Sequence, residues 1–303
     1  MINLLLCYLK SNWVTITFVL FVKFLLSCFF VVSWHDFFSF FENQCMKNKI
    51  SLIKTIYFNF RSFPFKQAIK MPAYLYGRVD IISLKGSMTV VDTKVVPGML
   101  RIGYTWGFRS KWKTRFVNRG KILFRGRDFM LGRGGEIAVL EGGCLEVGYN
   151  VQFTENVMVM CTKDIKVGNN VRIAYNSQLF DSDFHYTVSF ESKKIRPKQA
   201  AIVIGDYNWI GNHTTIKKGT VTPAYTIVAA SYSVLSKDYT KIVPEYSIIG
   251  GCPAKLLATG YARTWNNEFE IIKRMDDYFR NNPLERSYSL SDTESIEEYI
   301  RIQ

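Results

Sequence analysis

The chain has 303 residues, of which 48% are hydrophobic and 15% aromatic, with a formal net charge of +14. This apolar content excludes a largely disordered chain, and the length suffices for one long repeat domain with flanking segments or for two ordinary domains. The positive charge predicts an anionic partner or surface; nucleic acid, anionic lipid, phosphorylated sugar and a nucleotide cofactor all satisfy it.

The six cysteines are scattered and form no C-x-x-C pair. Their spacing argues against a disulfide framework and against a zinc site, so we expect reduced thiols and no metal. The positions are Cys7, Cys28, Cys45, Cys144, Cys161 and Cys252.

Residues 1–45 contain one long apolar segment. From Trp13 to Trp34 the only charge is Lys23, and twenty-two residues are enough to cross a bilayer. Basic residues follow, so the positive-inside rule would keep the rest of the chain in the cytoplasm, anchored to the inner face of the cytoplasmic membrane. The alternative is that translation starts at Met46 and the segment is not made. Both interpretations stay open.

Residues 46–77 are basic and aromatic, with breaks at Pro64 and Pro72. They predict a helical cap over the end of a repeat domain. Residues 78–145 alternate apolar residues with recurring glycines, which is typical of irregular early rungs of such a domain.

From residue 145 to about 236 an apolar residue recurs every six positions. No α-helix keeps one face apolar at this period, because its turn holds 3.6 residues, whereas short strands joined by tight corners do. A fixed short period indicates a solenoid, in which each unit buries its apolar side against its neighbours. The hexad positions are Val147, Phe153, Val159, Val167, Ile173, Leu179, Ile204, Ile210, Ile216, Thr222, Val228 and Val234.

Four asparagines stand three residues after hexad positions, at 150, 156, 170 and 176. Asparagine tolerates the left-handed backbone that a sharp corner needs. The sequence therefore predicts an all-β solenoid for residues 78–260.

A 22-residue excursion, residues 180–201, interrupts the repeat. Long insertions of this kind frequently carry functional residues. It carries His185, one of three histidines, close to Asp181 and Asp183. A histidine oriented by a carboxylate is the simplest general base near neutral pH, although an exposed loop histidine explains the pattern equally well.

Residues 204–263 contain several short motifs in a fixed order. Together with the DSDFH loop they resemble the hexapeptide-repeat acyltransferases, a superfamily of left-handed parallel β-helices, and are most similar to the O-acetyltransferases of bacterial surface polysaccharides. The motifs are Ile204-Gly205-Asp206, Trp209-Ile210-Gly211, Lys218-Gly219-Thr220, Ile227-Val228-Ala229-Ala230, Ser236-Lys237-Asp238-Tyr239 and Gly250-Gly251-Cys252-Pro253-Ala254-Lys255.

The resemblance implies a reaction and its catalytic residues. His185 would take the proton from a sugar hydroxyl as that oxygen attacks the thioester of acetyl-CoA, with no acyl-enzyme intermediate. Asp183 or Asp181 would hold the imidazole, and a backbone N–H near Gly211 would stabilise the oxyanion.

The resemblance also implies a donor site. Trp209 matches a tryptophan beside the active site, and Ala229, Ala230 and Ser231 match the stretch that lines the pantetheine groove. Lys237 and Lys255 match positions near the phosphates of coenzyme A. The alternative for both lysines is a solvated basic face, which suits Lys237 better than Lys255. These residues complete the predicted cofactor-binding set with Gly211.

The sequence departs from the family pattern at two places. Asn212 and His213 follow the Trp-Ile-Gly step where small residues are usual, so His213 is a corner residue and the second candidate base. Thr222 replaces an aliphatic hexad residue, which predicts a looser rung. Separately, Lys193, Lys194, Arg196 and Lys198 in the excursion suggest an acceptor that carries phosphate or diphosphate.

The expected assembly is a homotrimer with the active site between adjacent solenoids, so that His185 faces a neighbour's donor groove. The expected partner is a carbohydrate acceptor, free or linked to a nucleotide or lipid. After Pro244 the repeat fades, and residues 261–303 predict two helices without chemistry of their own, one within Trp265–Phe279 and one with its N-cap near Ser291 or Asp292.

Two other functions stay open. One is an N-acetyltransferase for an amino sugar; the other is a non-catalytic basic binding solenoid. Nucleic-acid binding is disfavoured: residues 109–133 hold nine basic residues among aromatics, but no nucleic-acid-binding motif accompanies them.

Overall fold

The computed structural model describes residues 48–107 and 110–301. The predicted anchor within residues 1–45 lies outside these ranges. Among the helices that are described, none combines the length and apolar character that spanning a bilayer requires.

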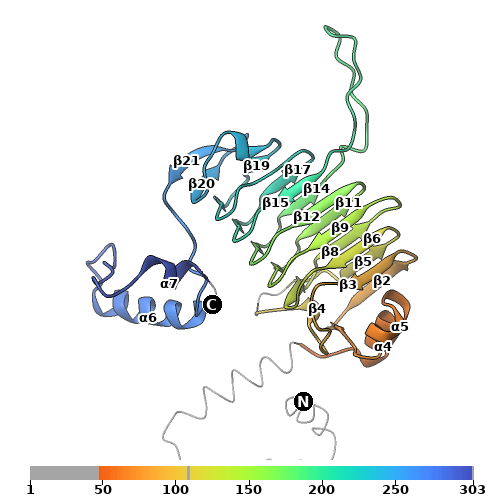
Figure 1. Cartoon of the computed structure of the whole chain (residues 1–303), viewed down its shortest axis with the longest axis horizontal. Coiled ribbons are helices and arrows are strands. Elements are labelled where there is room, and N and C mark those ends of the chain that lie inside the picture. The colour runs from red at the N-terminus through yellow and green to blue at the C-terminus, as the bar shows by residue number, and fades with distance from the viewer. Residues whose placement is uncertain (1–47, 108–109, 302–303) are drawn as a thin grey trace, which may run out of the picture.

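The strands form three sheets that share one winding path (Figure 1). The nine-stranded sheet, here called sheet one, comprises β1 (Ala73–Leu75), β4 (Leu100–Tyr104), β7 (Phe129–Gly132), β10 (Gln152–Phe153), β13 (Arg172–Ile173), β16 (Trp209–Ile210), β18 (Ile227–Val228), β20 (Ser247–Gly250) and β21 (Lys255–Thr259). Sheet two comprises β2 (Val79–Leu84), β5 (Thr114–Asn118), β8 (Glu136–Val139), β11 (Met158–Cys161), β14 (Gln178–Phe180), β17 (Thr215–Lys217) and β19 (Val234–Leu235). Sheet three comprises β3 (Ser87–Val90), β6 (Lys121–Phe124), β9 (Cys144–Val147), β12 (Asp164–Val167) and β15 (Ile202–Ile204).

Each strand pairs in parallel with the equivalent strand of the next rung. Through the regular rungs the partner is the third strand along the chain, so β10 pairs with β13 and β11 with β14. Only β20 and β21 pair in the antiparallel sense among these strands. The predicted all-β solenoid is therefore confirmed as three parallel sheets around one core, while the expected left-handed winding stays a prediction.

The hexad positions form that core. Eleven of the twelve are buried, including Phe153, Ile173 and Ile210, because each points inward from a short strand onto the rung below. The exception is Val234: its neighbour Leu235 is the buried residue and pairs with Ile216, so the last hexad runs one residue long.

The looser rung that was expected at Thr222 is not found. Its side chain is buried, and its Oγ1 accepts a hydrogen bond of 3.0 Å from the N–H of Gly205. A buried hydroxyl with a partner replaces an aliphatic contact here at little cost.

The four asparagines occupy corners with positive φ, as predicted. Their amides also bond along the solenoid axis: Asn150 donates to Asn170 at 2.9 Å, and Asn156 donates to Asn176 at 3.0 Å. These side-chain hydrogen bonds therefore connect adjacent rungs at two corners, where the backbone leaves the β-ladder.

Two helices, α4 (Leu52–Ser62) and α5 (Phe65–Ala68), cover the first rungs. The buried Asn59 amide joins α4 to β1, since it donates to the Ala73 carbonyl and accepts from the Ala73 N–H. The first strand therefore lies inside residues 46–77, one strand earlier than the boundary expected at residue 78.

The other end of the solenoid closes with a 3-10 turn, η2 (Tyr239–Lys241), and the β20–β21 hairpin. The tail then forms α6 (Glu268–Asn281) and α7 (Ile296–Ile300). The N-cap of α7 is Ser295, whose Oγ accepts from the Glu297 N–H, so the expected cap at Ser291 or Asp292 was placed too early.

Candidate functional site

Residues 181–201 form an arm that leaves the solenoid between β14 and β15 (Figure 1). Antiparallel bridges join Ser182 to Gln199 and Val188 to Ile195, so the insertion folds back on itself as a hairpin. The regular ladder resumes at β15, which pairs with β12, and the arm therefore adds a projection without disturbing the rungs.

His185 lies exposed on the arm, in the segment between the two bridged residues Ser182 and Val188. Within the described part of the chain its imidazole makes no hydrogen bond, ion pair or ring contact. The side chain is accessible to a substrate, but neither predicted carboxylate holds it in this structure.

Asp181 is fully buried and its carboxylate is already engaged. It accepts hydrogen bonds from the backbone N–H groups of Thr162, Lys163 and Asp164 and from the Thr162 hydroxyl, at 2.7 to 3.0 Å. A carboxylate shared among four donors holds a chain corner, so Asp181 does not orient His185 as had been one expectation.

Asp183 is partly exposed and lies beside two lysines. Its carboxylate is 2.8 Å from Lys218 Nζ and 3.8 Å from Lys217 Nζ. These ion pairs attach the arm to the strand β17 and to the residue that follows it. Of the two predicted carboxylates, Asp183 is the one that solvent and ligands reach.

The predicted donor residues gather at the corner between sheets one and two. Gly211 follows β16, and Ala229, Ala230 and Ser231 follow β18 one rung further on. Gly211 is tightly enclosed, because an added Cβ would come within 2.6 Å of the Ala230 nitrogen. Gly250 extends the column of small residues, since its Cβ position lies 2.8 Å from the Ala229 Cβ.

The Gly211 N–H does not face this corner's surface. It donates to the Val228 carbonyl at 2.9 Å within the ladder. The N–H of Gly211 itself is therefore already used inside the solenoid, and an oxyanion donor near Gly211 stays a prediction.

The remaining predicted residues, Lys237, Lys255 and His213, lie near this corner but not beside one another. Lys237 is exposed after β19, with Nζ 5.8 Å from the Tyr239 ring, and Lys255 is exposed at the start of β21. His213 occupies a corner at φ +56°, with its ring between Tyr175 and Tyr232. The predicted corner position of His213 is confirmed. Among the described residues, no hydrogen bond, ion pair or ring contact joins the donor set to His185.

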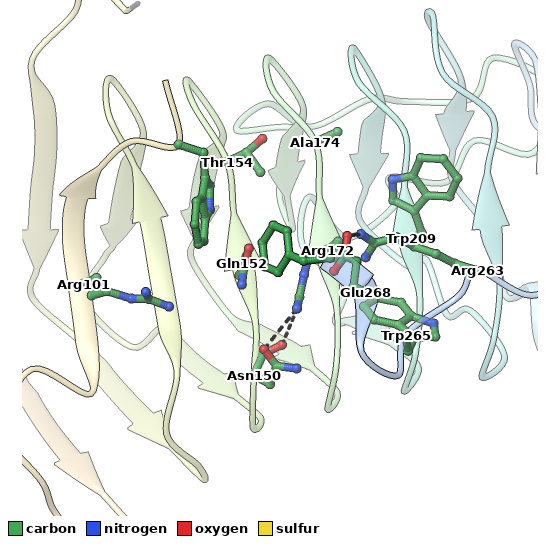
Figure 2. A pocket seen from close by; sticks show the side chains of 12 residues that line it. Arg101, Asn150, Gln152, Thr154, Arg172, Ala174, Trp209, Arg263, Trp265 and Glu268 are labelled. Atoms are coloured by element: carbon green, nitrogen blue, oxygen red, sulfur yellow. Dashed lines mark hydrogen bonds and ion pairs between the residues drawn. The ribbon is translucent and has the colours of Figure 1, made fainter. Parts of the chain in front are cut away.

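Trp209 lines a cavity of about 860 Å³ between sheet one and the N-terminal end of α6 (Figure 2). Polar side chains from successive rungs form its floor, and tail residues form its cover. The lining comprises Arg101, Trp106, Asn150, Gln152, Thr154, Arg172, Ala174, Trp209, Arg263, Trp265, Glu268 and Phe269.

Arginine side chains and indole rings dominate this cavity. The Arg263 guanidinium carbon lies 4.5 Å from the Trp265 ring centroid and 5.6 Å from that of Trp209. The Arg172 guanidinium carbon lies 5.2 Å from the Trp265 ring centroid, so this indole contacts two cations (Figure 2). Burial, and after it the positive charge of Arg263, lower the pKa of Arg172 to about 10.

Sequence reasoning missed the arginines and the tail residues of this cavity. Arg172 precedes the hexad residue Ile173 just as Trp209 precedes Ile210, so both point outward from sheet one in adjacent rungs. That shared register was a usable signal. The residues that cover the cavity could not be predicted from the sequence. Arg263, Trp265 and Glu268 reach the cavity only because of the path that the tail takes in three dimensions.

No family model matches the chain. Over 167 residues it is 28% identical to the Escherichia coli (strain K12) protein named "Putative lipopolysaccharide biosynthesis O-acetyl transferase WbbJ", an alignment that covers 52% of this chain and 79% of that protein. The chain resembles the hexapeptide-repeat O-acetyltransferases. This likeness confirms the resemblance expected from the sequence, and with it the acyltransferase class.

The sequence identities between this acyltransferase and the similar solved structures described here are all below 25%. The polySia specific acetyltransferase NeuO aligns with a TM-score of 0.47 and 18% identity, over 69% of this chain and 94% of its own. The polysialic acid O-acetyltransferase OatWY gives 0.40 and 16%, over 67% and 100%. The hexapeptide-repeat containing acetyltransferase VCA0836 of Vibrio cholerae O1 biovar eltor, complexed with acetyl coenzyme A, gives 0.37 and 23%, over 45% and 70%.

Proposed function

We propose that this protein transfers an acetyl group from acetyl-CoA to a hydroxyl of a bacterial surface polysaccharide or of its precursor. The observation that carries the proposal is the position of His185. It stands on an arm inserted at a break in the six-residue repeat, in a chain that is similar to an O-acetyltransferase.

In the proposed reaction the imidazole of His185 removes the proton from the acceptor hydroxyl as its oxygen attacks the thioester carbonyl. The C–S bond then breaks, the new ester keeps the acetyl group, and the imidazolium returns the proton to the sulfur of coenzyme A. The exposed position of His185 supports this role, because both substrates must reach the ring. Asp183, which forms ion pairs with Lys217 and Lys218, is the carboxylate proposed to orient the imidazole.

The proposed donor groove follows the corner of Gly211, Ala229, Ala230 and Ser231. Small side chains there let an extended pantetheine lie against the backbone. Trp209 would border the acetyl end, and the exposed Lys237 and Lys255 would meet the phosphates of coenzyme A. No oxyanion donor is assigned, since the Gly211 N–H is occupied.

We further propose that the active unit is a homotrimer of left-handed β-helices. The separation of His185 from the donor corner within one chain supports this, because a neighbouring copy can bring the two together. The free acceptor, or one linked to a nucleotide or lipid, would then bind between adjacent solenoids.

The proposed location is the cytoplasmic side of the membrane. The apolar segment within residues 1–45 supports it, as does an exposed apolar face on α4 and α5, flanked by lysines and arginines. Basic residues next to such a face favour an anionic lipid surface.

His185→Ala tests the catalytic assignment. We expect transfer, measured as coenzyme A released in the presence of acceptor, to fall by about 10²–10⁴-fold, because a general base is removed. His213→Ala is the matched control, since this second histidine sits in a corner and should leave the rate within a few-fold. Unchanged turnover in His185→Ala, with loss in His213→Ala, would contradict the proposal.

The chemistry of the product separates the remaining alternatives. Mass spectrometry of surface glycans from a strain that lacks the protein should show a missing acetyl ester. A missing acetyl amide would indicate the N-acetyltransferase instead, and unchanged glycans would favour the non-catalytic binding solenoid.

A further inference from the structure

We propose that the cavity between sheet one and α6 binds a carboxylate or phosphate group carried on the acceptor sugar. The identity of the ligand as acceptor rests on the proposed function. The binding of an oxyanion rests on the side chains of the cavity alone.

The charges of the cavity do not balance. Three arginines line it, Arg101, Arg172 and Arg263, against one carboxylate, that of Glu268. Glu268 already accepts a hydrogen bond from Arg263 in an ion pair. The cations Arg263 and Arg101 act on Arg172 together with the carboxylates of Glu268 and Asp128. Because Glu268 is already paired with Arg263, an anion entering the cavity would add a counter-charge that Arg172 lacks.

Arg172 has hydrogen bonds but no counter-charge. Its Nη1 donates to the Asn150 carbonyl at 2.7 Å, and its Nη2 donates to the Asn150 Oδ1 at 3.1 Å (Figure 2). Both acceptors are neutral, and within the described ranges no carboxylate lies at ion-pair distance from this guanidinium. A desolvated cation without a partner is unfavourable unless a ligand completes it.

Two further donors under the tail lack partners. Arg263 Nη1 and Trp265 Nε1 are buried and make no hydrogen bond. Both donors belong to the arginine–indole cluster, since the guanidinium carbons of Arg172 and Arg263 lie 5.2 and 4.5 Å from the Trp265 ring centroid. Unsatisfied donors around a cationic centre are the complement of an anion with several acceptor oxygens.

The rest of the lining suits a sugar ring. Trp106, Trp209 and Phe269 present aromatic faces, and Gln152 and Thr154 present hydrogen-bonding groups. A volume of about 860 Å³ is far more than a bare ion needs and lies in the range of small-molecule sites. Aromatic faces with a few polar groups and an arginine centre describe a site for an acidic or phosphorylated saccharide.

The cavity also adjoins the proposed donor groove. Trp209 pairs with Ile227 of the next rung, just before Ala229 and Ala230. A saccharide held by Arg172 would therefore lie beside the acetyl end of the donor. Coenzyme A itself would run along the corner and not fill this cavity.

The test is a titration of the tryptophan fluorescence of the full-length protein with glucose, glucuronic acid, glucose 6-phosphate and coenzyme A. We expect one charged sugar to bind at least about tenfold more tightly than glucose, and the identity of that sugar tells carboxylate from phosphate. Arg172→Gln should weaken its binding about tenfold or more, because it removes the charge and keeps hydrogen-bond donors. Equal binding of glucose, no effect of Arg172→Gln, or competition by coenzyme A would each overturn the proposal.

Two variants keep this test decisive. Arg119→Gln alters an exposed arginine of the solenoid outside the cavity and should leave binding unchanged. Arg101→Gln changes the arginine on the far side of the cavity from Arg263 and replaces Arg172→Gln should that variant fail to fold (Figure 2). His185→Ala separates the two proposals, since it should bind the charged sugar normally whether or not transfer fails.

Discussion

Asp181 shows how one residue can determine the start of the arm. Its buried carboxylate accepts from three consecutive backbone N–H groups of the neighbouring rung, and its own carbonyl accepts from the Ala200 N–H at 3.0 Å. The side chain of Asp181 thus fixes the start of the arm to the neighbouring rung, and its backbone carbonyl joins the start of the arm to its end.

We expect Asp181→Asn to lower the free energy of unfolding by about 2–4 kcal/mol, because one amide NH₂ would replace an oxygen that faces buried donors. Urea unfolding followed by circular dichroism measures the loss. Asp183→Asn, whose ion pairs with lysine are partly exposed, should change stability by less than about 1 kcal/mol. An Asp181→Asn protein with wild-type stability and no transfer would instead give this residue a catalytic role.

The same residues show what can be read from sequence. Asn150 and Phe153 were predictable because corner and core positions depend on local spacing, which repeats every six residues. The environment of Asp181 was not predictable, since its donors lie on the preceding rung. Arg172 was missed because its aromatic partner Trp265 lies in the tail, outside the repeat.

Among the elements, α4 carries two different faces. Thr55, Phe58 and Asn59 are buried against the first rungs. The opposite face, continued by α5, exposes large apolar side chains, with Ile53 at 85% and Phe65 at 70% of their surface. The full set is Leu52, Ile53, Ile56, Tyr57, Phe60, Phe65 and Ile69.

We expect a chain that starts at Met46 to bind vesicles containing an anionic lipid through this face, with affinity that falls as salt rises. Ile53→Glu with Phe65→Glu should reduce co-sedimentation about tenfold or more, because it adds negative charge to the apolar surface. Leu284→Glu, an equally exposed change in the tail, is the control. A wild-type chain that stays in the supernatant at low salt would contradict membrane docking.

Tail helices were expected to lack chemistry of their own, and α6 is found beside the cavity. Glu268 and Phe269 in its first turn line the cavity, and the Phe269 ring lies 5.9 Å from that of Trp106. The helix itself was foreseeable from its apolar spacing. Its place over sheet one was not, because the segment that leads to it follows no repeat.

At the scale of the whole molecule, the separation of His185 from the donor corner predicts how copies must cooperate. The native mass by light scattering should be three times the 35.1 kDa of one chain. Co-expressed His185→Ala and Trp209→Ala chains should recover about one quarter of wild-type activity. In a random mixture about half of the shared sites contain an intact His185, and about half of those also contain an intact Trp209 from the neighbouring chain. Either variant alone should be inactive. A monomeric mass, or no recovery in the mixture, would place both halves in one chain.

Both ends of the solenoid are covered. Helix α4 lies over the first rungs, and at the other end the buried Tyr239 donates to the Ala254 carbonyl beneath the β20–β21 hairpin. Parallel strands otherwise offer rows of free backbone groups, on which identical chains add end to end and grow into fibres. Because the strands of both end rungs are covered, copies can contact one another only through the sides of the solenoid. Crowding on a membrane would therefore yield closed assemblies and not filaments.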